Sequence, residues 1–164
     1  MLNTRTLVGG LFCDVRLGGL HLERIREHLA PGGALVFNCS LPYEDVERWP
    51  YWLPEGRRGL PEPWPRAAMA RKRAANGEEI SLRSRTIAFD PIEQMATREI
   101  EATLWRDGRA VTIEVHALRT RTFFRNELLV MLSHAGFSAV MVTGGYDGRP
   151  VSADNVQLVF TARQ

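Results

Sequence analysis

This sequence of 164 residues has few cysteines, a small net charge and no long apolar run. No apolar run approaches the roughly 20 residues that a membrane-spanning helix needs. The opening residues, MLNTRTLVGG, lack the apolar core of a secretory signal. The two cysteines, Cys13 and Cys39, are too few for a disulfide scaffold. We therefore expect a cytoplasmic protein.

Several kinds of site are also missing. The net charge of +2 is too small to favour nucleic acid or an anionic membrane as a partner. No Cys/His spacing indicates zinc, so no metal site is expected. No Gly-x-Ser-x-Gly nucleophile motif is present. The basic stretch RAAMARKRAANG has no interleaved aromatic residues, and it is typical of a solvated helix rather than a phosphate-binding site.

The composition is otherwise that of a globular domain, with 45% hydrophobic and 24% charged residues. The chain opens with the pattern strand, helix, strand. Leu7 and Val8 indicate a short strand, and the run ALVF at 34–37 indicates a buried one. Between them lies an apolar stripe at helical spacing, made of Leu20, Leu22, Ile25 and Leu29. Pro31 and the glycines after it end this helix.

The amino-acid composition changes twice in the middle of the chain. Residues 41–65 are rich in proline and tryptophan and predict a long ordered loop, because proline at that density excludes helix interiors and central strands. Residues 66–79 are rich in alanine and predict a short helix that ends at Asn76-Gly77. Residues 80–118 alternate like antiparallel strands, and Asp107-Gly108 is a favoured two-residue hairpin turn.

The last part of the chain predicts a helix followed by two strands. In TFFRNELLVMLSHAGF, Thr122 is the expected N-cap and Gly136 the expected terminator. The buried stripe is expected at Leu128, Leu129, Met131, Leu132 and Ala135. SAVMVT and VQLVFTA are strands joined by a loop of turn formers, GGYDGRPVSADN, and this pair is expected to be antiparallel.

Three stretches, in this order along the chain, resemble class I S-adenosylmethionine (SAM)-dependent methyltransferases of the small-molecule type. LERIREHLAPGGALVF is similar to the stretch before and through their fifth strand, and RNELLVMLSHAGFSAVMVTGGYDGRPVSADNVQLVFTARQ is similar to their ending. AFDPIEQ and the Asp107-Gly108 hairpin resemble the antiparallel sheet that such enzymes insert. The resemblance implies an α/β fold, a partial Rossmann-like methyltransferase sheet whose final pair is antiparallel. Residues 1–40 and 119–164 would form this core, 41–79 a loop and short helix, and 80–118 the inserted sheet.

The chain departs from that family where the cofactor should bind. No Gly-x-Gly-x-Gly follows a strand, and the family's first three strands have no counterpart. The resemblance therefore implies SAM as cofactor only if the missing N-terminal half is supplied. A parallel sheet without those strands exposes an edge and apolar helix faces. We expect a second copy or another chain to cover this open sheet edge.

The resemblance also implies candidate site residues. Phe12 and Cys13 lie where the family's fourth-strand loop passes the methyl-donor end of the cofactor, although both residue types are also common in cores. Four aromatic residues could line a pocket for an organic substrate, or could pack a stiff loop onto the sheet. They are Tyr43, Trp49, Tyr51 and Trp52.

His116 is the candidate catalytic base, and Arg119 beyond it is a candidate substrate-binding residue. A histidine could accept a proton from a substrate hydroxyl or amine. Methyl transfer from a sulfonium needs little beyond in-line positioning, so a base is optional. The alternative is an exposed histidine on a polar strand face.

Three functions fit these features. The first is a small-molecule methyltransferase, or part of one, acting on O or N. The second is a non-catalytic relative that keeps the substrate-side sheet and binds a partner. The third is a small α+β ligand-binding domain whose likeness to methyltransferases is superficial. A small-molecule substrate is expected for the first. The particular acceptor is not predicted, because fold resemblance alone supports only a reaction class.

Overall fold

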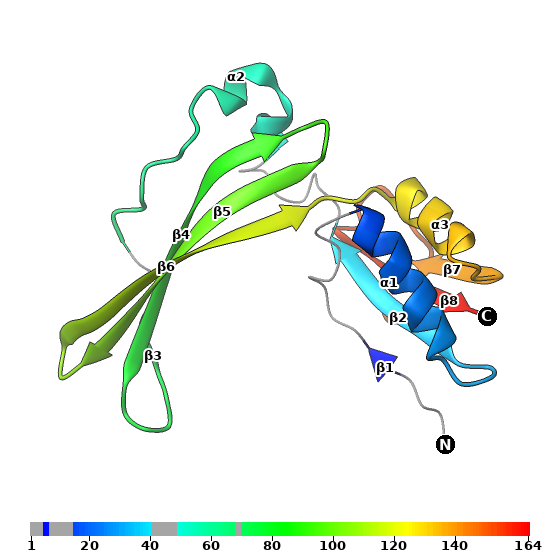
Figure 1. The fold of residues 1–164 in the computed structure, drawn as a ribbon, viewed down its shortest axis with the longest axis horizontal. Coiled ribbons are helices and arrows are strands. Elements are labelled where there is room, and N and C mark those ends of the chain that lie inside the picture. Colours follow the sequence, from blue (N-terminus) through cyan, green and yellow to red (C-terminus); the bar gives the residue numbers. More distant parts are fainter. Residues whose placement is uncertain (1–4, 7–14, 41–48, 68–69) are drawn as a thin grey trace. The chain divides into compact units, whose positions relative to one another are not determined.

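The computed structural model describes residues 5–6, 15–40, 49–67 and 70–164. It divides the chain into two compact units, and Figure 1 labels their helices and strands along the ribbon. The first unit combines Met1–Trp49 with Arg121–Gln164, and the second is Pro50–Thr120. Helices and strands are mixed in the first unit, and an antiparallel sheet dominates the second, so a mixed α/β architecture with antiparallel sheets is confirmed.

The first unit is built on a four-stranded sheet in the order β1-β2-β8-β7. The strands are β1 (Arg5–Thr6), β2 (Ala34–Ser40), β7 (Ala139–Thr143) and β8 (Gln157–Arg163). β1 pairs with β2 in parallel, and β8 pairs antiparallel with both β2 and β7. The predicted antiparallel final pair is therefore confirmed. The predicted first strand at Leu7 and Val8 lies outside the described residues.

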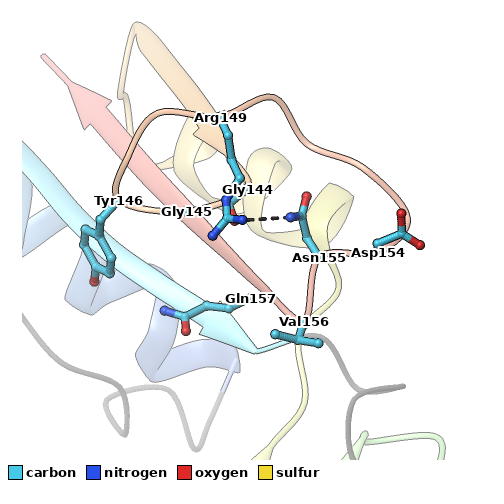
Figure 2. A pocket seen from close by; sticks show the side chains of 8 residues that line it. All are labelled: Gly144, Gly145, Tyr146, Arg149, Asp154, Asn155, Val156 and Gln157. Atoms are coloured by element: carbon cyan, nitrogen blue, oxygen red, sulfur yellow. Dashed lines mark hydrogen bonds between the residues drawn. The ribbon is translucent and has the colours of Figure 1, made fainter.

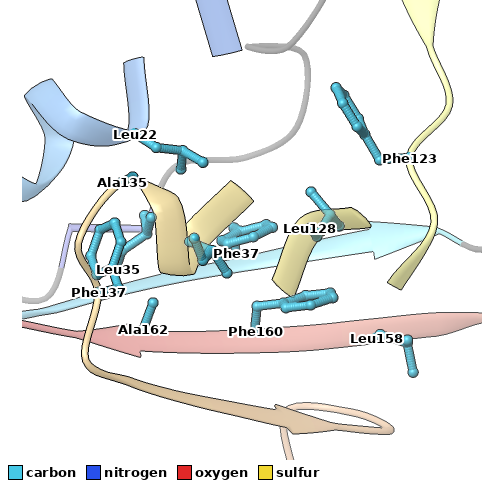
Figure 3. Close-up of a cluster of buried hydrophobic side chains, with 11 residues drawn as sticks. Leu22, Leu35, Phe37, Phe123, Leu128, Ala135, Phe137, Leu158, Phe160 and Ala162 are labelled. Atoms are coloured by element: carbon cyan, nitrogen blue, oxygen red, sulfur yellow. The ribbon is translucent and has the colours of Figure 1, made fainter. Parts of the chain in front are cut away.

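Two helices and one face of this sheet form the core. Helix α1 (Val15–Glu27) contributes Leu22, and helix α3 (Arg125–His134) contributes Leu128 and Leu132. Figure 3 shows Leu22 and Leu128 over alternate residues of β2 and β8. Phe37 stacks on Phe160 with ring centroids 5.0 Å apart, and Phe160 is fully buried. Alternation along a strand places these residues on one face.

The helix ends follow local chemistry, with one correction. Gly32 and Gly136 have φ of 75° and 85°, a conformation that strains residues with a Cβ, so both predicted glycine turns are confirmed. The N-cap predicted at Thr122 is wrong, because the cap residue is Phe124. The Glu127 carboxylate accepts a hydrogen bond from the Phe124 backbone N–H at 3.2 Å, so the helix starts where this acidic side chain can reach back.

The second unit is a sheet in the order β3-β4-β5-β6. Its strands are β3 (Lys72–Arg73), β4 (Glu79–Asp90), β5 (Met95–Arg106) and β6 (Arg109–Arg121). The predicted hairpin is confirmed, because β5 and β6 are joined at Asp107 and Gly108, whose φ values are 50° and 75°. Both central positions of such a turn need positive φ.

Two expectations for the middle of the chain need correction. The short helix predicted at 66–79 is wrong, because Lys72 and Arg73 pair with Ile80 and Glu79 as a hairpin. Gly77 has a φ of 85° and forms the turn of this hairpin. The proline-rich region is not all loop, since it holds η2 (Trp49–Trp52) and α2 (Pro54–Arg57). Pro54 fits the first turn of α2, where its missing N–H has no partner to lose.

Candidate functional site

Three strand ends meet at one edge of the first unit's sheet. β7 and β2 both run antiparallel to β8, so they are parallel to each other and to β1. The carboxyl ends of all three strands therefore lie at the same edge, beside the start of β8. Ligands of open α/β sheets bind outside the carboxyl ends of the strands. This edge is the candidate site.

The loop from β7 to β8 forms a hollow of about 250 Å³ at this edge. Figure 2 shows its lining residues, which come from the loop and the start of β8. Tyr146 and Gln157 extend toward β2, Arg149 lies within the curve of the loop, and Asp154 points away from it. The polar groups of the lining are thus a hydroxyl, two amides, a guanidinium and, directed outward, the Asp154 carboxylate, beside a row of strand ends.

Asn155 fixes the shape of this loop. Its Oδ1 accepts a hydrogen bond from the Ser152 N–H at 2.6 Å, and its Nδ2 donates to the Gly144 carbonyl oxygen at 3.2 Å. Gly144 has to be glycine, because a Cβ there would lie 2.5 Å from the Asn155 Oδ1. Thr143 Oγ1 also donates to the Gly145 carbonyl oxygen at 2.9 Å. The hollow is therefore preformed by internal bonds.

Replacing Asn155 with alanine is expected to lower the free energy of unfolding by about 1–3 kcal/mol, because it leaves the buried Gly144 carbonyl and the Ser152 N–H without their side-chain partner. Asn155 is only 9% exposed, so water does not easily replace its amide. Thermal denaturation measures the loss, and hydrogen exchange should show faster exchange across 144–155. Asp154→Ala, a change at the exposed neighbour, is the control and should leave both unchanged.

The hollow can orient a polar molecule without acid or base chemistry. The Tyr146 hydroxyl donates to Asn38 Oδ1 at 3.4 Å and so joins the loop to β2. Gln157 pairs with Ser40 at the end of β2 and places a second amide nearby. Hydroxyl and amide groups fix an acceptor atom by hydrogen bonds, and positioning alone supplies much of the rate of a transfer reaction. The arrangement suits group transfer to a positioned acceptor.

The described residues do not by themselves form a cradle for SAM. A nucleoside cofactor on a sheet of this kind needs a glycine-rich turn into a helix and an acidic side chain at a strand end. Gly144 and Gly145 follow β7, but the chain then returns to β8 without a helix. Phe12 and Cys13, the predicted cofactor-binding residues, lie outside the described residues.

The aromatic residues predicted for a substrate pocket are only partly brought together. Within the second unit, Tyr51 and Trp52 both pack against Phe89 of β4, with ring centroids 6.5 Å and 5.0 Å apart. Trp49 is 44% exposed, and Tyr43 lies outside the described residues. This packing matches the alternative in which a stiff loop covers the sheet. A role in substrate binding stays a prediction.

Glu62 is hydrogen-bonded to Tyr51, and no feature of the sequence predicts this role. Its carboxylate accepts hydrogen bonds from the Tyr51 hydroxyl and, at 2.5 Å, from the Thr86 backbone N–H. Partial burial raises the pKa of Glu62, but the bonds from Tyr51 and Thr86 and the charge of Arg98 outweigh it, and the net pKa is lowered. Glu62 is therefore a carboxylate at neutral pH.

His116 and Arg119 lie on β6, and both are exposed. His116 Nε2 is 3.2 Å from the Glu114 carboxylate, and its side chain is 72% exposed. A neighbouring carboxylate is a suitable partner for a histidine that accepts a proton. The catalytic role of His116 and the binding role of Arg119 stay predictions.

Cys39 lies at the end of β2, close to the candidate edge. Burial raises the pKa of its thiol, and the charge of Glu127 raises it further. A raised pKa keeps sulfur protonated, which makes Cys39 a poor nucleophile. Among the residues that the structure describes, no three His, Cys, Asp or Glu side chains are grouped to hold a metal ion. In the same residues, no helix is long and apolar enough to cross a membrane.

The residues of the hollow were recognised in the sequence only as turn formers. The signal that could have identified them is their position, because GGYDGRP directly follows a strand that is parallel to β2. What the sequence could not give is the return of Tyr146 to Asn38, 108 residues away along the chain.

The fold is that of SAM-dependent methyltransferases. An S-adenosylmethionine-dependent methyltransferase from Clostridium acetobutylicum matches 93% of this chain with a TM-score of 0.61 and 12% identity. DesVI from Streptomyces venezuelae matches 99% with a TM-score of 0.58 and 20% identity. The CcbJ methyltransferase from Streptomyces caelestis matches 95% with a TM-score of 0.54 and 21% identity. The sequence matches no protein-family model and no curated protein.

This chain spans a little over half of those proteins, between 53% and 60% of their lengths. Identities of 12–21% support a shared fold and not a shared substrate. The resemblance seen in the sequence to the class I methyltransferase fold is confirmed at this level.

Proposed function

We propose that this chain is the acceptor-facing portion of a SAM-dependent methyltransferase that acts on O or N of a small organic molecule. The observation that carries the proposal is the structural match to methyltransferases over 93–95% of the chain. The strand order β1-β2-β8-β7, parallel except for β8, supports it, because it is the order expected for the last strands of a partial Rossmann-like sheet. In this proposal residues 80–118 are an insertion in that sheet.

The coverage of the core sheet supports a partial domain. Within the described residues, α1 and α3 cover the face that carries Phe37 and Phe160. On the opposite face, Met141 and Ala139 of the end strand β7 are exposed, Met141 by 59%, whereas Val159 of β8 is buried. Sheets with parallel strands normally have helices on both faces. The proposal assigns the second layer, and the cradle for SAM, to polypeptide that pairs across the β1 edge, from the same protein or another chain.

The role proposed for the candidate edge is to bind the acceptor. Tyr146, Asn38 and Gln157 provide hydrogen-bonding groups at the strand ends, and SAM supplies the methyl group when it is bound. Because the transferred methyl moves from sulfonium to a nucleophilic O or N, these residues have only to orient the acceptor. Separately from this edge, the proposal keeps His116 of the second unit, 3.2 Å from the Glu114 carboxylate, as the base for acceptors that need to lose a proton.

A non-catalytic relative remains the second candidate function. The observation that favours it is the lack of a SAM cradle among the described residues. The third interpretation, a ligand-binding domain of unrelated fold, is disfavoured by the structural match. Calorimetry with S-adenosylhomocysteine, the demethylated product, separates the first two.

The native gene product is tagged at its C-terminus and purified together with any protein bound to it. We expect this sample to bind S-adenosylhomocysteine with a dissociation constant in the micromolar range, on the order of −8 kcal/mol. The 164-residue chain alone should bind at least about 100-fold more weakly, because the groups that hold the nucleoside lie elsewhere. An absence of binding to the native protein at millimolar concentration would contradict the methyltransferase proposal and support the non-catalytic relative.

A further inference from the structure

The hairpin that joins β3 to β4 carries Asn76 and Gly77 at its tip. The Ala74 N–H donates to the Glu78 carbonyl oxygen at 2.8 Å, and the Gly77 N–H donates to the Ala74 carbonyl oxygen at 3.0 Å. Gly77 has a φ of 85°, and apart from its chain neighbours no described residue has an atom within 4 Å of the position that a Cβ would take. Asn76 is exposed as well, so the peptide bond between the two residues is accessible to solvent.

Both ends of the Asn76 side-chain amide are bonded to Glu78. Its Oδ1 accepts a hydrogen bond from the Glu78 backbone N–H at 3.1 Å, and its Nδ2 donates to the Glu78 carboxylate at 2.7 Å. The first bond closes a ring that contains the Gly77 backbone, so it keeps the Asn76 side chain close to the Gly77 nitrogen. The same bond also stabilises the negative charge that develops on Oδ1 when a nucleophile attacks the adjacent Cγ.

An asparagine held in this way can react with the backbone that follows it. The next backbone nitrogen loses its proton to hydroxide and attacks Cγ, the Cγ–Nδ2 bond breaks, and ammonia leaves with a proton from water. The product is a succinimide ring. Water opens this ring at either carbonyl and gives aspartate or isoaspartate, in which the backbone runs through the β carbon. A following glycine favours the attack, because no Cβ obstructs the approach.

We propose that Asn76 is a site of spontaneous deamidation, in which the Gly77 nitrogen is the nucleophile and water is the co-reactant. The hydrogen bonds of the turn do not prevent the reaction, because they lie at an exposed hairpin tip where water replaces them at little cost. β3 is a strand of only 2 residues, Lys72 and Arg73, so this end of the sheet opens readily. The nitrogen attacks in the conformations in which its bond to Ala74 is open.

Glu78 links this reaction to the rest of the sheet. Its carboxylate accepts the bond from Asn76 Nδ2 and another from Arg106 of β5 at 2.5 Å. Deamidation replaces the donor group of Asn76 with a second carboxylate, and two like charges at hydrogen-bond distance repel each other. Isoaspartate also lengthens the backbone of the turn, which disrupts the bond between Ala74 and Glu78. We expect β3 to separate from β4 and to leave this edge of β4 without its partner.

Two other positions in the chain serve as internal controls. Asn155 is only 9% exposed, and the residue after it is Val156, whose β-branched side chain obstructs its own nitrogen. Asp107 is followed by glycine at an exposed turn, as Asn76 is, but a carboxylate is a much poorer electrophile than an amide. A reaction that needs an exposed amide followed by glycine therefore distinguishes Asn76 from both.

Peptide mapping by mass spectrometry tests the proposal on the full chain after storage at neutral pH and physiological temperature. Isoaspartate should accumulate at position 76 at least about tenfold faster than at Asn155 or Asp107, because a buried or ionised group reacts only through an unfavourable equilibrium. The rate should rise about tenfold per pH unit near neutrality, because the deprotonated nitrogen is the nucleophile. A rate at position 76 no faster than at Asn155 overturns the proposal. Aspartate without isoaspartate indicates direct hydrolysis and also overturns it.

Asn76→Gln is the matched variant, because it keeps a neutral amide at the same exposed position but requires a larger ring. It should slow the conversion at least about tenfold, and an unchanged rate contradicts attack by Gly77. The converted fraction, separated by ion exchange, should show faster hydrogen exchange across residues 72–80 than the unconverted protein, with no change at the Asp107-Gly108 turn. Equal exchange in the two fractions overturns the release of β3. None of these outcomes depends on whether the protein binds S-adenosylhomocysteine.

Discussion

Replacing Phe160 with alanine is expected to lower the free energy of unfolding by about 3–5 kcal/mol, the largest effect of any substitution considered for this chain. Phe160 on β8 has no exposed surface and stacks on Phe37 of β2 at 5.0 Å, in the core to which α1 and α3 contribute. Removing the ring forfeits its burial and leaves a cavity, because packed helices collapse only partly into such a space. Urea denaturation followed by far-UV circular dichroism measures the loss.

Val130→Ala is the control for this experiment. Val130 lies on α3 but is 67% exposed, so its truncation should change stability by no more than about 0.5 kcal/mol. A loss below about 1 kcal/mol for Phe160→Ala would contradict the packing of the first unit, since full burial of an aromatic ring cannot be worth so little.

Replacing Glu62 with glutamine is expected to cost about 1–3 kcal/mol at neutral pH, because charged acceptors make the stronger hydrogen bonds. The lowered pKa fixes the pH dependence. A carboxylate whose pKa is lower in the folded state stabilises fully above its ordinary value of 4.5, and the contribution is lost as pH falls through the lower folded value. The difference between wild type and Glu62→Gln should therefore shrink on acidification below 4.5.

Tryptophan fluorescence can follow this unfolding, because Trp52, Trp64 and Trp105 all lie in the second unit. Tyr51→Phe removes the partner hydroxyl, and combining it with Glu62→Gln gives a double-mutant cycle for their bond. Glu93→Gln, at the exposed β4–β5 turn, should show no such pH-dependent difference. If Glu62→Gln matched wild type at every pH, the carboxylate would not hold Tyr51 as described.

Local signals predicted the parts of this fold that local chemistry dictates. The Asp107-Gly108 turn and the Gly136 terminator were readable because each requires a particular backbone conformation. The helix predicted at residues 66–79 is wrong because the helix preference of alanine is weak, and pairing of Lys72 and Arg73 with β4 overrides it. The Asn76-Gly77 pair, which would also suit the end of a helix, forms a hairpin turn instead.

The location of the candidate site can be predicted from the sequence, but its side chains cannot. Its location follows from topology, since strand ends in a sheet with parallel strands share an edge. Its side chains do not, because the contact of Tyr146 with Asn38 joins distant parts of the chain. The support of Tyr51 by Glu62 was equally hidden, since no periodicity exists in the proline-rich segment between them.

In the β7–β8 loop, the residues that hold the backbone in place, Asn155 and Gly144, are different from the exposed residues that can be changed. Its internal bonds end on backbone atoms of Gly144 and Ser152, and residues 146–154 are exposed. Substitutions there can alter the chemistry that the strand ends present without disturbing the core. A randomised library over these positions is therefore a natural starting point for directed evolution of ligand preference, with Asn155 and Gly144 held constant.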